Sequence, residues 1–242
     1  MKRVWFFPAV VGILLASPLP TWAISRTVVM ESAAAYADHV WSMNPENETA
    51  SCASGYSSDY DYPGTYTGLP YDWDGCISIS TFDQQIADGY GAGSHSWHGI
   101  LSCTTGVDCS GYVSQLWQSG HYTTSSFHQV SYQISASEIR EGDAYNEAGS
   151  HIVLWAYESG DGSPVYYEAS GSASKVRLNV SSWSVLSGYV PIRYDLIEDG
   201  PPERAIARPS AALAGRVCAV PTARRDLLPE LVHLSEMAET VD

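Results

Sequence analysis

Apolar residues recur at helical spacing in two short stretches of the chain. The first covers residues 27–41, TVVMESAAAYADHVW, and predicts an amphipathic helix that ends before Pro45. Its apolar residues are Val28, Met30, Ala34, Tyr36, Ala37, Val40 and Trp41. The second stretch begins at Cys109, and its apolar face consists of Tyr112, Val113, Leu116 and Trp117. We expect a helix at each place.

Strand-like apolar runs follow later in the chain. Residues 151–156 and 165–169 have the length of strands, and the connector 158–164, ESGDGSP, is dense in turn residues. These two runs predict a β-hairpin, and a further strand is expected near 188–194. Helices followed by antiparallel strands are typical of the α+β class. Residues 52–99 are rich in Gly, Ser, Asp and Tyr and are expected to form long ordered loops with little regular structure.

The two ends of the chain have a different composition. Lys2 and Arg3 precede an apolar run, and Thr21-Trp22-Ala23 resembles a cleavage site, so residues 1–23 are predicted to be a secretory signal peptide. That run is too short for a stable membrane span, and no later segment is expected to cross a membrane. Residues 198–242 are rich in Pro, Ala and Arg and are predicted to be a linker and tail, with a short helix near 226–239. Residues 24–197 remain as one folded domain.

The net charge of the chain disfavours two classes of binding partner. It has 27 acidic and 12 basic residues, a net charge of −15, and removal of residues 1–23 takes away two basic residues and no acidic one. A protein this acidic is a poor partner for nucleic acid or for anionic membrane surfaces. We expect a secreted monomer, extracellular or periplasmic, that binds neither.

Five cysteines have a particular meaning in an exported protein. They are Cys52, Cys76, Cys103, Cys109 and Cys218. Disulfides persist outside the cytosol, but an odd number leaves one cysteine over, as a reactive thiol or as an intermolecular bridge. The sequence does not choose among the possible pairings.

Cys109 lies where a thiol could be activated. Asp108 is a good N-cap residue, so the helix would begin at Cys109 and place the sulfur beside the unpaired first-turn amides and the positive end of the helix dipole. Both features lower the pKa of a thiol. Ser110 and Gly111 are small and leave room for a substrate carbonyl. A structural cysteine is the alternative interpretation.

His151 is the best candidate for a base. It opens the apolar strand HIVLWA, and Glu168 lies in the second strand of the hairpin. A turn about Ser159-Gly160 would place Glu168 directly opposite His151, whereas a turn centred on Asp161 would leave it diagonal at best. A carboxylate in an otherwise apolar strand needs a partner, and His151 is the nearest available.

These residues resemble the NlpC family of papain-like bacterial cysteine peptidases. DCSGYVSQLW is similar to the family's nucleophile motif, GLPYDWDG (68–75) to its tyrosine motif, EGD (141–143) to the loop before the base strand, and HIVLW to that strand. The resemblance spans residues 27–195. The chain departs from the pattern at Glu168, where His, Asn or Gln is common, at Asp74 in place of Gly, and in the long segment between Tyr71 and Cys109.

The resemblance implies a fold, a reaction and a substrate. It implies a papain-like α+β core with N-terminal helices packed on an antiparallel sheet, no metal and no cofactor. Cys109 would be the nucleophile, His151 the base and then the acid, and Glu168 the group that orients His151. Tyr71, Asp108 and Ser110 would line the substrate and oxyanion site. The substrate would be the stem peptides of peptidoglycan, cleaved through an acyl-enzyme.

Two other functions fit the same residues. A thiol amidase or acyltransferase acting on a non-wall substrate would use the same triad. A catalytically inactive, disulfide-stapled glycan-binding module would instead use the aromatic loop at 56–73 and would have an oxidised, unreactive Cys109. Hydrolysis of purified peptidoglycan distinguishes the first alternative, and alkylation of Cys109 distinguishes the second.

Overall fold

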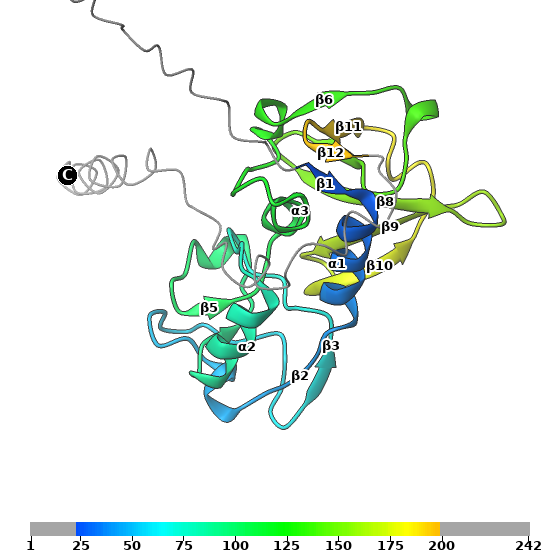
Figure 1. Ribbon diagram of the computed structural model, residues 1–242. Coiled ribbons are helices and arrows are strands. Elements are labelled where there is room, and N and C mark those ends of the chain that lie inside the picture. Colours follow the sequence, from blue (N-terminus) through cyan, green and yellow to red (C-terminus); the bar gives the residue numbers. More distant parts are fainter. Residues whose placement is uncertain (1–22, 199–242) are drawn as a thin grey trace, which may run out of the picture.

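The computed structural model describes residues 23–198 (Figure 1). The predicted signal peptide, apart from Ala23, and the tail with its expected helix near 226–239 lie outside the described residues. The α-helices are α1 Arg26–Asp38, α2 Ile79–Ala87 and α3 Cys109–Trp117. Short 3-10 helices are η1 Pro45–Glu48, η2 Ser96–His98, η3 Phe127–Gln129 and η4 Ala136–Glu138. The strands are β1 Ile24–Ser25, β2 Val40–Ser42, β3 Thr65–Thr67, β4 Gly91–Ala92, β5 Thr104–Thr105, β6 Ser131–Gln133, β7 Ala144–Glu147, β8 His151–Glu158, β9 Pro164–Ser170, β10 Lys175–Val180, β11 Val190–Tyr194 and β12 Ile197–Glu198.

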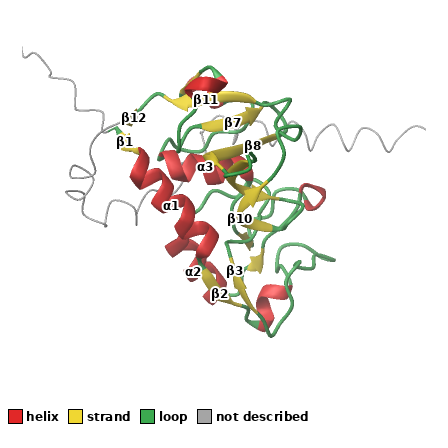
Figure 2. Cartoon of the chain, turned by 90° about the vertical axis from the view of Figure 1, so that its right-hand side faces the viewer, coloured by secondary structure: helices red, strands yellow, loops and turns green. Residues whose placement is uncertain are grey.

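One antiparallel sheet organises the molecule. Its strand order is β10-β9-β8-β7-β11-β6, and every neighbouring pair is antiparallel. Helices α1 and α3 pack against β8, β9 and β10, as Figure 2 shows from the side. The main core lies between them and includes Val29, Val113, Ile152, Leu154 and Ala169. The predicted α+β class, with helices packed on an antiparallel sheet, is confirmed.

The first helix is shorter than its sequence pattern predicts. Ser25 caps it by accepting a hydrogen bond from the N–H of Val28, and its buried apolar residues Val29, Ala33, Tyr36 and Ala37 follow helical spacing. The helix ends at Asp38. The chain then extends, so residues 40 and 41, predicted to be helical, belong to β2 and pair with β3. This end of the prediction was wrong because an apolar pair alone does not distinguish a last helical turn from a short strand.

The region predicted as loops holds more regular structure than expected. Ser78 caps α2 by accepting from the N–H of Thr81, and Phe82 and Ile86 of α2 are buried. Strands β3, β4 and β5 also lie in or beside this region. These elements have two to nine residues each, so none contains enough apolar repeats to stand out from the polar sequence around it.

A buried ion-pair cluster ties the start of α1 to the sheet. Asp143, fully buried just before β7, accepts from Arg26 at 2.9 Å and from Arg193 of β11 at 2.8 Å. Removal of either arginine would leave part of a buried charge unpaired, which is strongly destabilising. Asp143 of the EGD motif is therefore structural, and it fixes the turn that leads toward β8. Among residues 23–198, no helix is long and apolar enough to cross a membrane.

Candidate active site

Asp108 sets the start of α3. One carboxylate oxygen accepts from the N–H of Gly111 at 2.6 Å and from the hydroxyl of Ser110 at 2.9 Å, and the other accepts from the N–H of Asp74 at 3.1 Å. This is the N-cap that the sequence predicts. The side chains of Asp108 and Ser110 are engaged in the cap itself, and their direct contact with a substrate stays a prediction.

Gly111 allows the loop before α2 to lie against α3. A Cβ at this position would be 2.0 Å from the carbonyl oxygen of Gly75 and 2.9 Å from the Cβ of Cys76. No side chain fits there. The absent side chain thus lets the helix start and the segment after the tyrosine motif pack in direct contact.

Cys109 is the free cysteine of the described residues, and it is buried. The backbone N–H groups of Ile152, Ser110 and Cys109 itself lie near enough to the sulfur to favour its thiolate form and lower its pKa. Ile152 follows His151, so the first residues of β8 lie against the sulfur. The structure therefore brings together the helix start and the strand start that the sequence singled out.

The charge state of Cys109 differs from the sequence-based expectation. Burial and, to a smaller extent, the Asp108 carboxylate raise the pKa of the thiol, the three nearby N–H groups lower it only in part, and the net pKa is about 12. The expected N–H groups at the helix start are present, but desolvation outweighs them. The thiol is therefore protonated at neutral pH and needs a base to become a nucleophile.

His151 is held by a carboxylate. Its Nε2 lies 3.0 Å from Oε2 of Glu168, and Glu168 is buried. The other oxygen, Oε1, accepts from Nε and an Nη of Arg177 at 2.9 and 2.8 Å. Burial raises the pKa of Glu168, but the hydrogen bonds and charges of His151 and Arg177 outweigh it and lower the pKa overall. Glu168 is thus a carboxylate near neutral pH.

Of the two hairpin registers that the sequence allows, the structure has the one with its turn centred on Asp161. Trp155 pairs with Tyr166 and Glu158 with Pro164, with an irregularity between them, so the turn is centred on Asp161. In this register Glu168 is diagonal to His151 on the same face of the sheet. Two long side chains can bridge a diagonal pair, and they do so here. Arg177 lies directly opposite Glu168 on β10.

Tyr71 lies within electrostatic range of Cys109 and Asp108. Burial raises the pKa of its hydroxyl, and the nearby charges of Cys109 and Asp108 raise it further, so the phenol stays neutral. The side chain of Tyr71 is buried, and its ring would lie 3.5 Å from a Cβ added at Gly171. A neutral phenol is a hydrogen-bond donor, which is the property an oxyanion or a substrate carbonyl requires.

Three further residues near the site were not predicted. Arg177 belongs to a strand that the sequence pattern did not reveal. The ring of Tyr189 lies edge-on to that of His151 at 6.4 Å, and burial raises its pKa to about 12. His121 is buried near Asp108, and its Nε2 has no hydrogen-bond partner among the described residues. The spacing of these residues in the chain gives no signal of their proximity.

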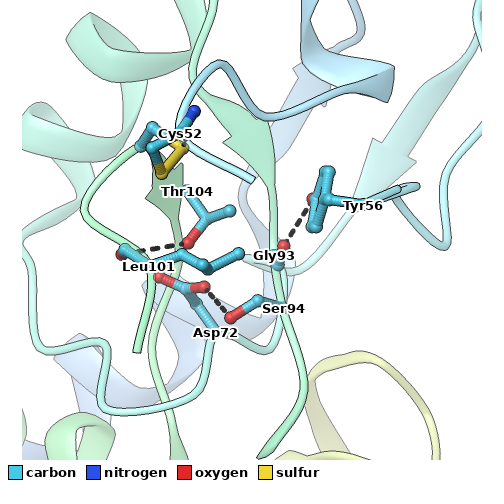
Figure 3. Close-up of a disulfide and its surroundings, with 8 residues drawn as sticks. Cys52, Tyr56, Asp72, Gly93, Ser94, Leu101 and Thr104 are labelled. Carbon is cyan, nitrogen blue, oxygen red and sulfur yellow. Dashed lines mark hydrogen bonds between the residues drawn. A yellow bond between two sulfur atoms is a disulfide. The ribbon is translucent and has the colours of Figure 1, made fainter. Parts of the chain in front are cut away.

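The disulfide Cys52–Cys103 joins the segment after η1 to the segment before β5 (Figure 3). Near it, Ser94 donates to the buried carboxylate of Asp72 at 2.6 Å, and Tyr56 donates to the carbonyl of Gly93. Cys76 is also a disulfide cysteine. Cys218 lies outside the described residues. Cys109 is thus the unpaired thiol of the described residues, as predicted.

The aromatic loop at 56–73 is mostly folded inward. Tyr56, Tyr60 and Tyr71 are buried, and Tyr60 packs edge-on against Trp41 and Tyr66. Most of these rings therefore serve loop packing. Within residues 23–198, no group of three His, Cys, Asp or Glu side chains is arranged to hold a metal ion.

Comparison with known proteins gives likenesses among solved structures. The peptidoglycan hydrolase RipB from Mycobacterium tuberculosis matches with 20% identity and a TM-score of 0.41, over 72% of this chain and 65% of that one. The P60 domain of a Mycobacterium avium subspecies paratuberculosis antigen matches with 19% identity and a TM-score of 0.41, over 72% and 95% of the two chains. A hypothetical invasion protein of M. tuberculosis matches with 27% identity and a TM-score of 0.34, over 52% and 55%.

The matched region is slightly less than two thirds of RipB. No family model and no curated protein matches the chain.

Proposed function

We propose that this protein is an exported cysteine hydrolase that cleaves amide bonds in the stem peptides of peptidoglycan. The observation that carries the proposal is the free, buried thiol of Cys109 at a helix start, in contact with the first residues of β8, where His151 is tied to Glu168. Nucleophile, base and orienting carboxylate are the parts that thiol hydrolysis needs. The motif resemblance supplies the substrate class.

Acylation follows from the atoms in place. Glu168 occupies Nε2 of His151, which leaves Nδ1 to accept the thiol proton. The sulfur then attacks the amide carbon, and the carbonyl oxygen becomes an oxyanion that the hydroxyl of Tyr71 and the N–H of Cys109 can stabilise. The C–N bond breaks as Nδ1 returns the proton to the leaving amine. The product is a thioester on Cys109.

Deacylation reuses the same groups. Nδ1 accepts a proton from water, the hydroxyl attacks the thioester carbon, and the C–S bond breaks as the proton returns to sulfur. The result is a free carboxylic acid and the original thiol. Glu168 stays ionised throughout, because Arg177 and His151 stabilise its charge, and it holds the imidazole in one tautomer.

Export is part of the same proposal. A predicted signal peptide precedes the domain, and the Cys52–Cys103 disulfide is suited to an oxidising compartment. Cleavage after Ala23 would release a protein whose substrate lies outside the cytosol. The expected mature product therefore begins near Ile24.

The test of the substrate is digestion of purified, protein-free peptidoglycan by the protein without residues 1–23. We expect soluble peptides with newly formed amino and carboxyl ends, identified by liquid chromatography and mass spectrometry. Heat-inactivated protein is the control. If no peptide is released while a simple thioester or amide substrate is turned over, the reaction class holds and the substrate class is wrong.

A further inference from the structure

Trp97 of η2 is the most exposed large apolar side chain of the described residues, at 73% of its surface. Its ring stacks on the imidazole of His95, with centroids 4.1 Å apart and planes inclined by 9°. One face of the indole is therefore covered by His95, and the opposite face is open to solvent.

The imidazole on which Trp97 stacks is held in one position. Asp59 lies 2.5 Å from Nε2 of His95 and is also contacted by the hydroxyl of Ser174. The disulfide Cys52–Cys103 ties the loop that precedes Asp59 to the end of the segment that carries Trp97. A ring fixed before binding loses little conformational entropy when a ligand packs on it.

The stack also leads to the proposed active site. The imidazole of His95 stacks on Tyr71 as well, at 5.8 Å and 28°, and Tyr71 is near enough to Cys109 for a charge there to act on its hydroxyl. His95 and Tyr71 also line a small pocket, together with polar side chains that include Asp59, His98 and Ser174. A ligand on the open face of Trp97 would be separated from the active site by the rings of Trp97, His95 and Tyr71. An extended stem peptide of a few residues can span that separation.

We propose that the open face of Trp97 binds a pyranose ring of the glycan strand whose stem peptide enters the active site. The C–H face of an N-acetylated amino sugar packs on a flat indole, while its hydroxyl and amide groups can take hydrogen bonds from the polar groups around the pocket. The inference rests on the proposed function for its substrate, because peptidoglycan joins such sugars to the cleaved peptides. It assigns to Trp97 the recognition of the sugar.

The first measurement is calorimetric titration of the full protein with the tetramer of N-acetylglucosamine, a saccharide without a stem peptide. We expect Trp97→Ala to weaken binding about tenfold or more, and Trp97→Tyr to retain most of it. Trp183→Ala is the matched control, because Trp183 is also exposed and also stacks on a neighbouring ring, Trp155 at 5.7 Å. It should bind as the wild type does.

The second measurement is the ratio of kcat/KM for a glycan-bearing peptidoglycan fragment to kcat/KM for the sugar-free stem peptide. The ratio should fall about tenfold in Trp97→Ala and stay unchanged in Trp183→Ala.

The two proposals fail in distinguishable ways. If the wild type binds no saccharide, or if Trp97→Ala binds as well as the wild type, the sugar site is wrong, whatever the hydrolytic activity. If saccharide binding depends on Trp97 but no stem peptide is cleaved, the sugar site holds and the proposed hydrolysis fails. Tight binding of an aromatic peptide in place of the saccharide would also overturn the inference.

Discussion

The thiol of Cys109 is subject to two opposing effects. Burial and the charge of Asp108 disfavour the thiolate, whereas three backbone N–H groups favour it, and the balance raises the pKa to about 12. The resting protein thus holds a neutral thiol rather than a preformed thiolate–imidazolium pair. Proton transfer to His151 belongs to the attack itself.

This balance predicts the pH dependence of alkylation. Below the pKa of a thiol, the thiolate fraction and hence the alkylation rate rise about tenfold per pH unit. For Cys109 we expect this rise to continue from pH 7 to pH 10 with iodoacetamide. Free cysteine, the control, should level off above about pH 8.5. A rate for Cys109 that is already level between pH 6 and 8 would contradict the neutral resting thiol.

Asp72 makes the stability of the fold depend on pH. Its carboxyl is buried, and burial outweighs the hydrogen bond that Ser94 donates, so the pKa is raised to about 6. The folded state therefore favours the protonated form. This contribution is fully present below the unfolded pKa near 3.9 and is lost as the pH rises through 6.

The expected size is a loss of about 2 kcal/mol in the free energy of unfolding between pH 4 and pH 7. The full difference of about two pKa units, at 1.36 kcal/mol each, is reached only below pH 4, because the unfolded carboxyl is already about half ionised there. Asp72→Asn should lack this component and gain stability relative to the wild type as the pH rises. Urea unfolding of both proteins at several pH values measures it. Parallel curves for the two proteins would contradict the assignment.

At the scale of elements, the position of α3 depends on the contact between Gly111 and the segment at Gly75. Gly111→Ala places a Cβ 2.0 Å from a backbone oxygen, so the helix or the loop must shift. We expect a loss of about 1–3 kcal/mol or more in the free energy of unfolding, and a fall in activity because Cys109 moves with the helix. Thermal unfolding and the peptide assay measure the two effects.

Gly160→Ala is the matched control for this substitution. Gly160 lies in the exposed hairpin turn, and a Cβ there meets nothing within 4 Å. Its unfolding free energy should stay within about 0.5 kcal/mol of the wild type. If both alanine variants unfold at the same temperature, the close approach at Gly111 does not fix α3.

The elements with strong local signals were predictable. Asp108 before an apolar face gave the start of α3, and the turn-rich connector gave the β8–β9 hairpin. The exact register was not predictable, because two turn centres fit the same residues. Arg177 was missed for a related reason, since its contact with Glu168 depends on the pairing of β10 with β9. Helix α2 was missed because it is short and mostly polar.

At the scale of the whole molecule, the sheet holds the base and its carboxylate while α3 carries the nucleophile. The α1 and α3 side of the sheet carries the main core, and the opposite face carries a smaller cluster that includes Tyr145, Val153, Trp155 and Tyr166. His151 and Glu168 lie at the edge of that second face. The site therefore forms where the helix start meets the end of the sheet, and neither layer contains it alone.

The central claim is that Cys109 is the nucleophile, and its most direct test is kcat/KM of Cys109→Ala on a stem peptide that the wild type cleaves. Circular dichroism and an intact Cys52–Cys103 disulfide verify the fold of the variant. We expect at least a thousandfold loss, with residual catalysis only from binding and oxyanion stabilisation. Activity of the folded Cys109→Ala protein within a few fold of the wild type would contradict the account.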